Sequence, residues 1–381
     1  MFPNAIKLFS LNGFDIKVDP SWALIAALIT WSLSENYFPA TIPDQTLATY
    51  LSMAIAAMLL FFASLICHEL AHSVVARRLG MNISSITLFL FGGVAEIEDE
   101  PNSAGVEFWV ALAGPATSLC LALSFWLLSA IASLPLGTTP ITVVLSYLAA
   151  INLVLALFNL VPAFPLDGGR VLRAYLWNKS GDRLKATETA AKSGATFAYV
   201  LMALGVLGLF QGALVYALWQ IMIGGFLLFA SRASYQQQLA RVVFGNRTVA
   251  EIMHRYPITV DPDMTLSELA NNIILHEGVS FVPVVEDGVL LGHIDQATLA
   301  KIDRENWSST RVEDVYVEID ESTTIGSDMP VQDLLARISN TGIRKFLVVS
   351  DHRLLGVISL SDLIRYLNWS DRSPPVQTTH T

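Results

Sequence analysis

The segment that most constrains this chain is Cys67-His68-Glu69-Leu70-Ala71-His72, because it places two imidazoles and a carboxylate inside a long apolar run. The run LATYLSMAIAAMLLFFASLI leads into it and is long enough to cross a bilayer as a helix, which takes about 20 residues. On a helix, His68 and His72 lie one turn apart on the same face, and Glu69 projects beside them. An ionised group within a span costs roughly 2.5 to 3.5 kcal/mol, so such a cluster requires partners or a function.

This H-E-x-x-H spacing is typical of zinc sites in which two neutral imidazoles bind the metal and the glutamate acts as general base toward water. The alternatives are a chance match and three polar groups packed into a helix interface. We predict one zinc ion per chain, with His68 and His72 as ligands and Glu69 as the base. Cys67 is interpreted as a packing neighbour and not as a ligand.

Composition divides the 381 residues into two parts. Hydrophobic residues make up 53% and charged residues 15% of the whole, but the long apolar runs end near Ala230 and an acidic, soluble type of sequence begins at Gly245. We therefore expect a membrane domain at 1–230, a linker at 231–245 and a soluble domain. The net charge of −10, without a patch rich in lysine and arginine, argues against nucleic acid as a partner.

The apolar runs predict an α-helical polytopic membrane protein, surrounded by lipid bilayer, with six transmembrane helices and small membrane-associated β elements. A hairpin is expected around Asn12-Gly13, and strands are expected within ISSITLFLFGGVAEIEDEP. Besides the span that carries the zinc motif, the expected spans are at 22–33, 106–134, 141–161, 195–210 and 214–229.

Six spans place both termini on one side of the membrane. The loops on the other side, SENYFPATIPDQT, PLGTTP and QG, contain no lysine or arginine. By the positive-inside rule we predict a protein of the cell (inner) membrane with cytoplasmic N- and C-termini. The basic residues that fall on the predicted cytoplasmic side are Lys7, Lys17, Arg77, Arg78, Arg170, Arg173, Lys179, Arg183, Lys185 and Arg232.

Catalytic zinc usually takes three protein ligands, and Asp167 is the best candidate for the third. It follows the fourth span within NLVPAFPLDGGR, where Pro162, Pro165, Gly168 and Gly169 preclude a regular helix. Irregular backbone at membrane depth is tolerated only where it lines a protein or water cavity. The alternative is that Asp167 merely caps a helix that starts at Gly168, since aspartate is favoured at N-caps.

Four motifs together resemble the site-2 protease family, peptidase family M50, of intramembrane zinc metalloproteases. They are HELAH in the second span, FGGVAEI after it, AGPATS in the third span and NLVPAFPLDGGR after the fourth. The resemblance covers about residues 1–230 and implies cleavage of peptide bonds within or near transmembrane segments of a single-span substrate, such as a membrane-anchored regulator. It implies His68, His72 and Asp167 as zinc ligands, Glu69 as base and Asn159 as a polar group near the reacting carbonyl.

The resemblance also implies that Gly92, Gly93 and Val94 in FGGVAEI offer an exposed strand edge to an unwound substrate. Two positions depart from the family pattern, because many relatives have asparagine where Ser118 stands and histidine where Asp19 stands. The first departure puts a catalytic role for Ser118 in doubt. The role of Asp19 does not follow from the sequence.

The soluble part contains an internal repeat. Leu291-Gly292-His293-Ile294 aligns with Leu355-Gly356-Val357-Ile358, and around each lies a helix, a strand, a turn, a second strand and another helix. This pattern resembles a tandem pair of CBS modules, an α/β domain, at 246–309 and 310–369, followed by a disordered tail at 370–381. Pairs of such modules often bind adenine nucleotides in the cleft between them.

The second repeat has Ser359 and Asp362 at a helix start, as expected for ribose contact, whereas the first has Asp295 and Thr298 there. One competent site, for ATP or AMP as a regulator, is therefore expected. The alternative is a purely structural pair, or one that forms a homodimer, because resemblance of fold does not establish a site.

The sequence therefore favours a zinc metalloendopeptidase that performs regulated intramembrane proteolysis. One alternative is a CBS-regulated metal transporter that uses the same polar residues as a transit site. A transport path would need polar residues that recur across several spans, and the other spans contain few. The other alternative is an inactive protein that holds membrane clients without cutting them.

Overall fold

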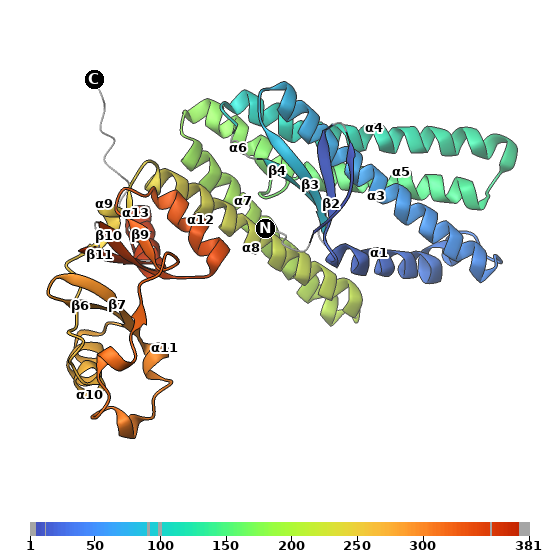
Figure 1. The fold of residues 1–381 in the computed structure, drawn as a ribbon. Coiled ribbons are helices and arrows are strands. Elements are labelled where there is room, and N and C mark those ends of the chain that lie inside the picture. Colours follow the sequence, from blue (N-terminus) through green and yellow to red (C-terminus); the bar gives the residue numbers. More distant parts are fainter. Residues whose placement is uncertain (1–4, 12, 90–91, 98–100, 351–352, 373–381) are drawn as a thin grey trace. The chain divides into compact units, whose positions relative to one another are not determined.

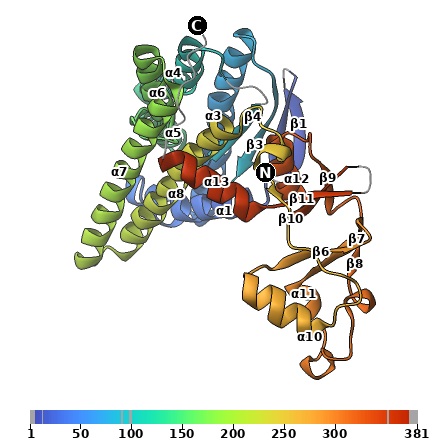
Figure 2. The same cartoon turned by 90° about the vertical axis from the view of Figure 1, so that its left-hand side faces the viewer.

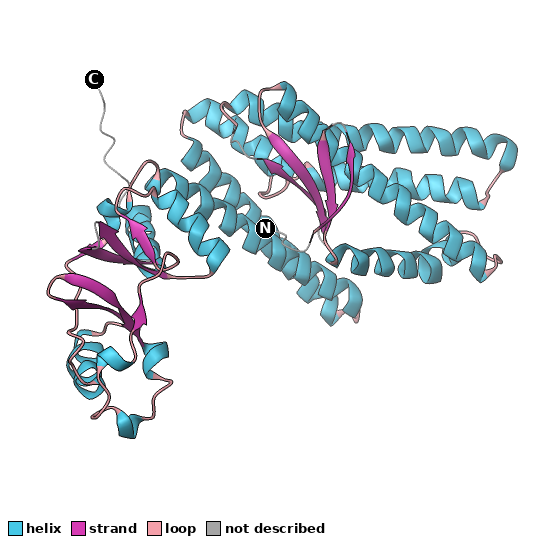
Figure 3. Ribbon diagram, viewed as in Figure 1, coloured by secondary structure: helices cyan, strands magenta, loops and turns pink. Residues whose placement is uncertain are grey.

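The chain forms two compact units, Met1–Gln236 and Gln237–Thr381, in the computed structural model (Figure 1). Long helices dominate the first unit, which also contains one sheet, whereas the second unit combines short helices with two small sheets (Figure 3). The structure describes residues 5–11, 13–89, 92–97, 101–350 and 353–372.

A four-stranded sheet lies in the first unit. β1 (Ile6–Leu11) and β2 (Phe14–Val18) form the antiparallel hairpin that the sequence predicts, with Gly13 at a φ of +79° in the turn. β3 (Ile83–Phe89) lies parallel to β2, and β4 (Gly92–Ile97) pairs antiparallel with β3. The strand order is β1-β2-β3-β4, so β4 is an edge strand.

This sheet packs against the helix that carries the zinc motif, α3 (Leu47–Arg78). Phe14, Ile16 and Ile86 are fully buried, and the partly buried side chains that cover them come mainly from α3, namely Ile66, Leu70 and Val74. Burial of apolar surface contributes about 25 cal/mol per Å², so this contact fixes the sheet beside the motif.

Five helices among the described residues are long and apolar enough to cross a membrane, which confirms the polytopic helical class. Side chains of Thr46, Ser103, Thr139 and Asp182 accept backbone hydrogen bonds at their N-termini, as N-caps do. The five helices are α3, α4 (Ala104–Leu136), α5 (Pro140–Asn159), α7 (Arg183–Phe210) and α8 (Leu214–Phe244).

The first predicted span, at 22–33, is a helix of 12 residues, α1 (Ser21–Ser32). It continues as a π-helical turn at Leu33–Tyr37 and a final turn, α2 (Phe38–Thr41). Asp19 accepts a hydrogen bond from the backbone of Ser21 at 2.9 Å, and hydrogen bonds from Ser21 hold the pKa of this carboxyl below its usual value. Asp19 therefore fixes the start of α1. Since α1 alone is too short to span, the six-span count stays a prediction.

The last two long helices extend beyond their predicted ends. α7 begins at Arg183 and not near 195, because Asp182 caps a polar turn that precedes the apolar segment. α8 continues past 229 through the predicted linker at 231–245 to Phe244, which is 2% exposed within the second unit. The linker is thus helical, since its Gln and Ala residues suit a helix and its end has an apolar core to enter.

The second unit contains two α/β modules, which confirms the tandem arrangement (Figure 2). The first module has the sheet order β6-β7-β8 and the second β5-β11-β10-β9. The first contains α10 (Leu266–Glu268), a π-helical segment Leu269–Leu275, β6 (Phe281–Glu286), β7 (Val289–Asp295), α11 (Gln296–Leu299) and β8 (Val317–Glu318). The second contains α9 (Val249–Ile252), β5 (His254–Arg255), β9 (Thr324–Gly326), α12 (Val331–Thr341), β10 (Lys345–Ser350), β11 (Arg353–Ser359) and α13 (Leu360–Arg372).

The two modules exchange short segments, so their cores differ from the predicted ranges 246–309 and 310–369. Val249 is fully buried in the second core and β5 pairs with β11, although both lie within the range predicted for the first module. Val312 is fully buried in the first core and β8 pairs with β7, although both follow it. A sequence repeat identifies similar segments, but it does not reveal which of the two modules a short flanking segment joins. Residues 370–372 complete α13, and the rest of the predicted tail lies outside the described residues.

Candidate metal centre

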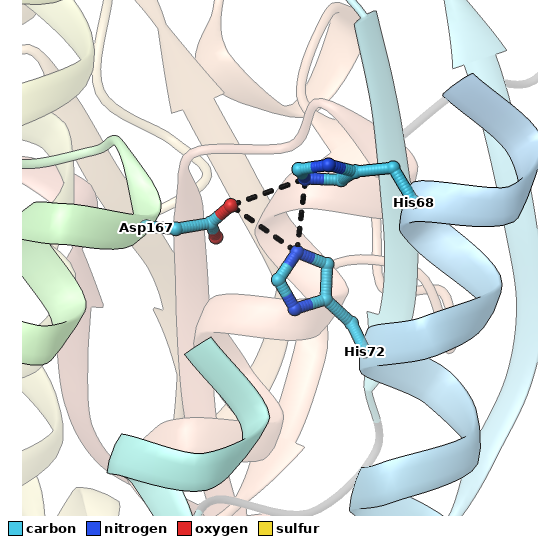
Figure 4. Close-up of side chains that lie close together, drawn as sticks. All are labelled: His68, His72 and Asp167. Atoms are coloured by element: carbon cyan, nitrogen blue, oxygen red, sulfur yellow. Dashed lines mark hydrogen bonds and ion pairs between the residues drawn. The ribbon is translucent and has the colours of Figure 1, made fainter. Parts of the chain in front are cut away.

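Three polar side chains from two helices converge in the first unit. His68 and His72 occupy successive turns of α3 and are 2% and 4% exposed, and Asp167 is the first residue of α6 (Asp167–Ser180). Oδ2 of Asp167 lies 3.2 Å from Nε2 of each histidine, and the two Nε2 atoms lie 3.2 Å apart (Figure 4). The structure thus brings together the three residues that the sequence singled out as ligands.

The outer nitrogen of each imidazole has a partner on α4. Nδ1 of His72 lies 2.6 Å from the carbonyl oxygen of Val110, and a carbonyl only accepts, so this nitrogen carries a proton. In the neutral ring the lone pair is then on Nε2, which faces Asp167. Nδ1 of His68 lies 2.8 Å from the hydroxyl of Ser118. Such contacts fix the tautomer and the orientation of metal-binding histidines.

The spacing of the three inward atoms fits zinc. A zinc–nitrogen distance of about 2.0 to 2.1 Å places neighbouring ligand atoms of a tetrahedral ion roughly 3.3 Å apart. The three separations here are each 3.2 Å. A carboxylate and neutral imidazole nitrogens are the chemistry that zinc prefers, and three protein ligands leave a fourth position for water or substrate.

Gly114 of α4 leaves the space that this cluster occupies. A Cβ atom at this position would lie 2.2 Å from Nε2 of His72 and 2.5 Å from Nε2 of His68. No side chain larger than hydrogen fits at these distances. Gly114 therefore belongs to the centre because it has no side chain.

The loop that precedes Asp167 packs tightly onto the first turn of α6. A Cβ atom at Gly168 would lie 2.3 Å from the carbonyl oxygen of Leu160, and one at Gly169 would lie 2.4 Å from the backbone nitrogen of Phe164. The two glycines after the aspartate therefore allow the loop to fold back over the helix start.

Helices α7 and α8 hold this loop from the other side. The backbone N–H of Phe164 donates to the carbonyl of Ala190 on α7, and the hydroxyl of Ser231 on α8 donates to the carbonyl of Phe164. The hydroxyl of Ser193 donates to the carbonyl of Pro162. The position of Asp167 thus depends on α6, α7 and α8 together.

The alternative that Asp167 only caps a helix is wrong. The N-cap residue of α6 is Leu166, and no side chain makes a capping hydrogen bond there. The carboxylate of Asp167 turns instead toward the histidines, and its other oxygen lies 3.9 Å from Nη1 of Arg170.

Comparison with known proteins identifies the family. The model of peptidase family M50 matches residues 56–138 and 135–206, and the CBS domain model matches 249–305 and 312–368. Rip3 of Mycobacterium tuberculosis, which is named as a zinc metalloprotease, is 35% identical over 99% of this chain and 96% of its own length. The chain belongs to peptidase family M50.

Two further proteins extend the comparison. A zinc metalloprotease of Methanocaldococcus jannaschii is 30% identical to this M50 chain over 96% of each. The solved site-2 protease from the same organism matches 61% of this chain and 95% of its own, with 28% identity and a TM-score of 0.43. The family models and the curated relatives confirm the predicted family, the class of zinc metalloprotease in the membrane and the tandem CBS pair.

Two other predicted residues of the M50 site lie on its helices. Glu69 follows His68 on α3 and is half-buried, and its carboxylate makes no hydrogen bond within the described part of the chain. Asn159 is the last residue of α5 and is also half-buried, and across the same residues its side chain makes no hydrogen bond either. The catalytic roles of both residues stay predictions.

The predicted substrate edge coincides with β4. Gly92, Gly93 and Val94 lie opposite Phe89, Leu88 and Thr87 of β3, and the far side of β4 pairs with no strand among the described residues. The backbone therefore has the position that strand addition requires.

Sequence reasoning missed the contribution of α4 to this M50 site. Val110, Gly114 and Ser118 lie along one buried stripe of the helix and adjoin the two histidines, and Glu107 belongs to the same stripe. The spacing of a glycine and a serine at i and i+4 in an apolar span is the signal that could have revealed it. Ser118, whose catalytic role was in doubt, orients His68.

In the CBS pair, the predicted nucleotide residues contact each other. The hydroxyl and the backbone N–H of Ser359 donate to Oδ2 of Asp362 at 2.6 and 3.0 Å, and the N–H of Asp362 donates to the hydroxyl of Ser359. In the first repeat, burial alone would raise the pKa of Asp295, and hydrogen bonds from Thr298 hold it below its usual value. A pocket of about 350 Å³ adjoins Asp362, and its lining also includes His254, Arg365, Tyr366 and Trp369.

Proposed function

We propose that His68, His72 and Asp167 bind one zinc ion at which the protein hydrolyses peptide bonds in or near transmembrane segments of other proteins. The observation that carries this proposal is the convergence of three inward ligand atoms, each 3.2 Å from the other two. With the proton of His72 on its outer nitrogen, Nε2 of His72 and Oδ2 of Asp167 face each other as two acceptors, an arrangement that a cation between them would stabilise.

Zinc bound here supplies a Lewis acid that polarises the scissile carbonyl and lowers the pKa of water. Glu69 accepts a proton from the attacking water and delivers it to the leaving amine, as a general base and then acid. Asn159 donates a hydrogen bond that holds the reacting carbonyl. Ser118 and Val110 keep the imidazoles in position throughout, since their partners are the nitrogens that do not face the metal.

The substrate is a single-span membrane protein, such as a membrane-anchored regulator. A transmembrane helix satisfies its own backbone hydrogen bonds, so a protease must unwind it and provide other partners. The free edge of β4 at Gly92, Gly93 and Val94 offers such partners to an extended chain. Regulated intramembrane proteolysis is the process in which this chemistry would act.

The protein lies in the cell (inner) membrane with both termini in the cytoplasm. The support is the one-sided placement of lysine and arginine among the loops. Reporter fusions after Ser231 and after Thr381 should report cytoplasm, and a fusion at Gln45 should report the opposite side. A fusion after Thr381 that reports the outside would contradict both this orientation and the six-span count.

An adenine nucleotide, ATP or AMP, regulates cleavage by binding beside Asp362. The pocket there combines aromatic side chains suited to a base with Arg365, which suits a phosphate. Ser359 and Asp362 contact the ribose, and the N-terminus of α13 faces phosphate. For regulation, the nucleotide must bind two conformations of the protein with different affinities, because equal affinity leaves the equilibrium between them unchanged.

The test compares purified wild-type protein with Glu69→Gln on a panel of single-span membrane proteins. The wild type should cleave at least one of them, and Glu69→Gln should lose roughly 100-fold or more of that rate while it keeps its zinc. His68→Ala should lose both zinc and cleavage. Cys67→Ala, next to the motif and without a proposed role, is the matched control and should keep both. Cleavage by Glu69→Gln at the wild-type rate would show that another group is the base.

A further inference from the structure

A buried ion pair joins α4 to α6 outside the ligand set. Glu107 is fully buried and Arg173 is 9% exposed. Both Nε and Nη2 of Arg173 donate to Oε1 of Glu107, the first at 2.6 Å. Oε2 of Glu107 has no hydrogen-bond partner within the described residues. Burying two charges costs several kcal/mol per ion, and an apolar pair of similar volume often stabilises a fold as well or better. Stability alone therefore does not account for this pair.

The pair lies on the elements that carry the metal centre. Glu107 belongs to the same buried stripe of α4 as Val110, Gly114 and Ser118, which contact the two histidines. Arg173 lies on α6, the helix whose first residue is Asp167. One face of α4 thus orients the histidines and, through Glu107, holds the helix that supplies the third ligand.

Arg173 also contacts the loop that leads into Asp167. Its guanidinium carbon lies 4.9 Å from the centre of the Phe164 ring, which is a cation–π distance. Phe164 is the residue that Ala190 and Ser231 hold through its backbone. The guanidinium therefore fixes α6 on two sides, against α4 and against the loop.

We propose that the Glu107–Arg173 pair is a positioning device that sets the place of Asp167 relative to His68 and His72. An apolar contact tolerates sliding, whereas an arginine that donates two hydrogen bonds to one carboxylate fixes the helix along its axis. A shift of α6 by the rise of one residue, about 1.5 Å, would break the 3.2 Å triangle of ligand atoms. The inference rests on the zinc site proposed above.

The experiment measures how fast the full-length protein releases zinc to excess EDTA, and the visible absorption of its cobalt-substituted form. Glu107→Gln and Arg173→Gln should each release zinc about tenfold faster or more, as loss of a supporting contact does, with a changed cobalt spectrum. The double variant Glu107→Gln/Arg173→Gln should regain much of the wild-type retention, because two amides still hydrogen-bond and no charge is buried alone. That non-additivity is the signature of a working pair.

Two results would overturn the proposal: single variants that release zinc at the wild-type rate, or a double variant that releases it as fast as the two single effects combined. If a single variant does not fold, Arg173→Lys is measured in its place, because lysine keeps the positive charge but cannot donate the paired hydrogen bonds of a guanidinium. Lys192→Gln, which breaks the exposed pair with Glu188 on α7, is the control and should not change release.

The zinc proposal and this inference fail differently. A wild-type protein that binds no zinc, or a His68→Ala variant that keeps it, overturns both. A wild-type protein that holds zinc, with His68→Ala empty and Glu107→Gln unchanged, overturns the positioning role alone.

Discussion

The metal centre and the nucleotide site of the CBS pair were both predicted from short motifs, but their residues have different hydrogen-bond partners in the structure. At the metal centre, atoms from α3 and α6 converge on one point, and the imidazole nitrogens that face away from it hydrogen-bond to groups on α4. In the second CBS module, Ser359 and Asp362 hydrogen-bond to each other and close the N-terminus of α13 as a capping pair.

The difference separates polar groups that require a ligand from polar groups that are satisfied without one. With the proton of His72 on its outer nitrogen, an imidazole nitrogen and a carboxylate oxygen face each other as two acceptors, so the inward face of the metal centre favours a cation. The CBS residues already have partners, and a ribose would have to compete with a cap that contributes about 1 kcal/mol. The same kind of sequence motif thus supports a stronger inference in the membrane unit than in the soluble one.

Among the substitutions that test this comparison, Gly114→Ala should have the largest effect. The added Cβ atom would lie within 2.5 Å of both inward nitrogens, so the histidines must move apart or the helix must shift. We expect loss of bound zinc and of cleavage, together with roughly 1 to 3 kcal/mol of destabilisation from overpacking. Metal analysis and thermal unfolding of the purified variant provide the measurements.

The same helix offers the control. Gly105→Ala adds the same atom to α4 at a position where nothing lies within 4 Å, so zinc and activity should stay at the wild-type level. Normal zinc retention by Gly114→Ala would mean that the cluster has more room than these distances allow, and the convergence argument would fail.

The residues with chemical motifs were predictable, and those that act through shape were not. The spacing of His68 and His72 fixes their common face because helix geometry is local. Asp167 is almost 100 residues away in sequence, and its place followed from the need for a third ligand and from the broken helix around it. The motif that contains Gly114 and Ser118 was recognised, but their contacts with the histidines were not predicted, because an apolar span has many equivalent faces and only packing selects the one that meets α3.

The fold shows the same limit. The hairpin, the strands after the motif and the long helices follow from periodicity and composition. The exchange of β5 and β8 between the CBS modules did not follow, because a two-residue strand has no pattern of its own. The helical continuation of α8 was missed because its polar face resembles a linker in composition.

The smallest effect is expected for Asp362→Ala. This variant tests whether the CBS site, like the metal centre, binds a ligand. Loss of the carboxylate removes both hydrogen bonds from Ser359 and should cost about 1 kcal/mol of the stability of this module.

If the pocket beside Asp362 takes an adenine nucleotide, calorimetry on the full-length wild type should show binding of ATP or AMP, and Asp362→Ala should abolish it. The matched control is Asp295→Ala, which removes the corresponding cap of α11 in the first repeat and should leave nucleotide binding intact. Nucleotide should also change the rate of cleavage by the wild type and not by Asp362→Ala. Absence of binding at millimolar nucleotide would make Ser359 and Asp362 a helix cap only, and the contrast with the metal centre would then be complete.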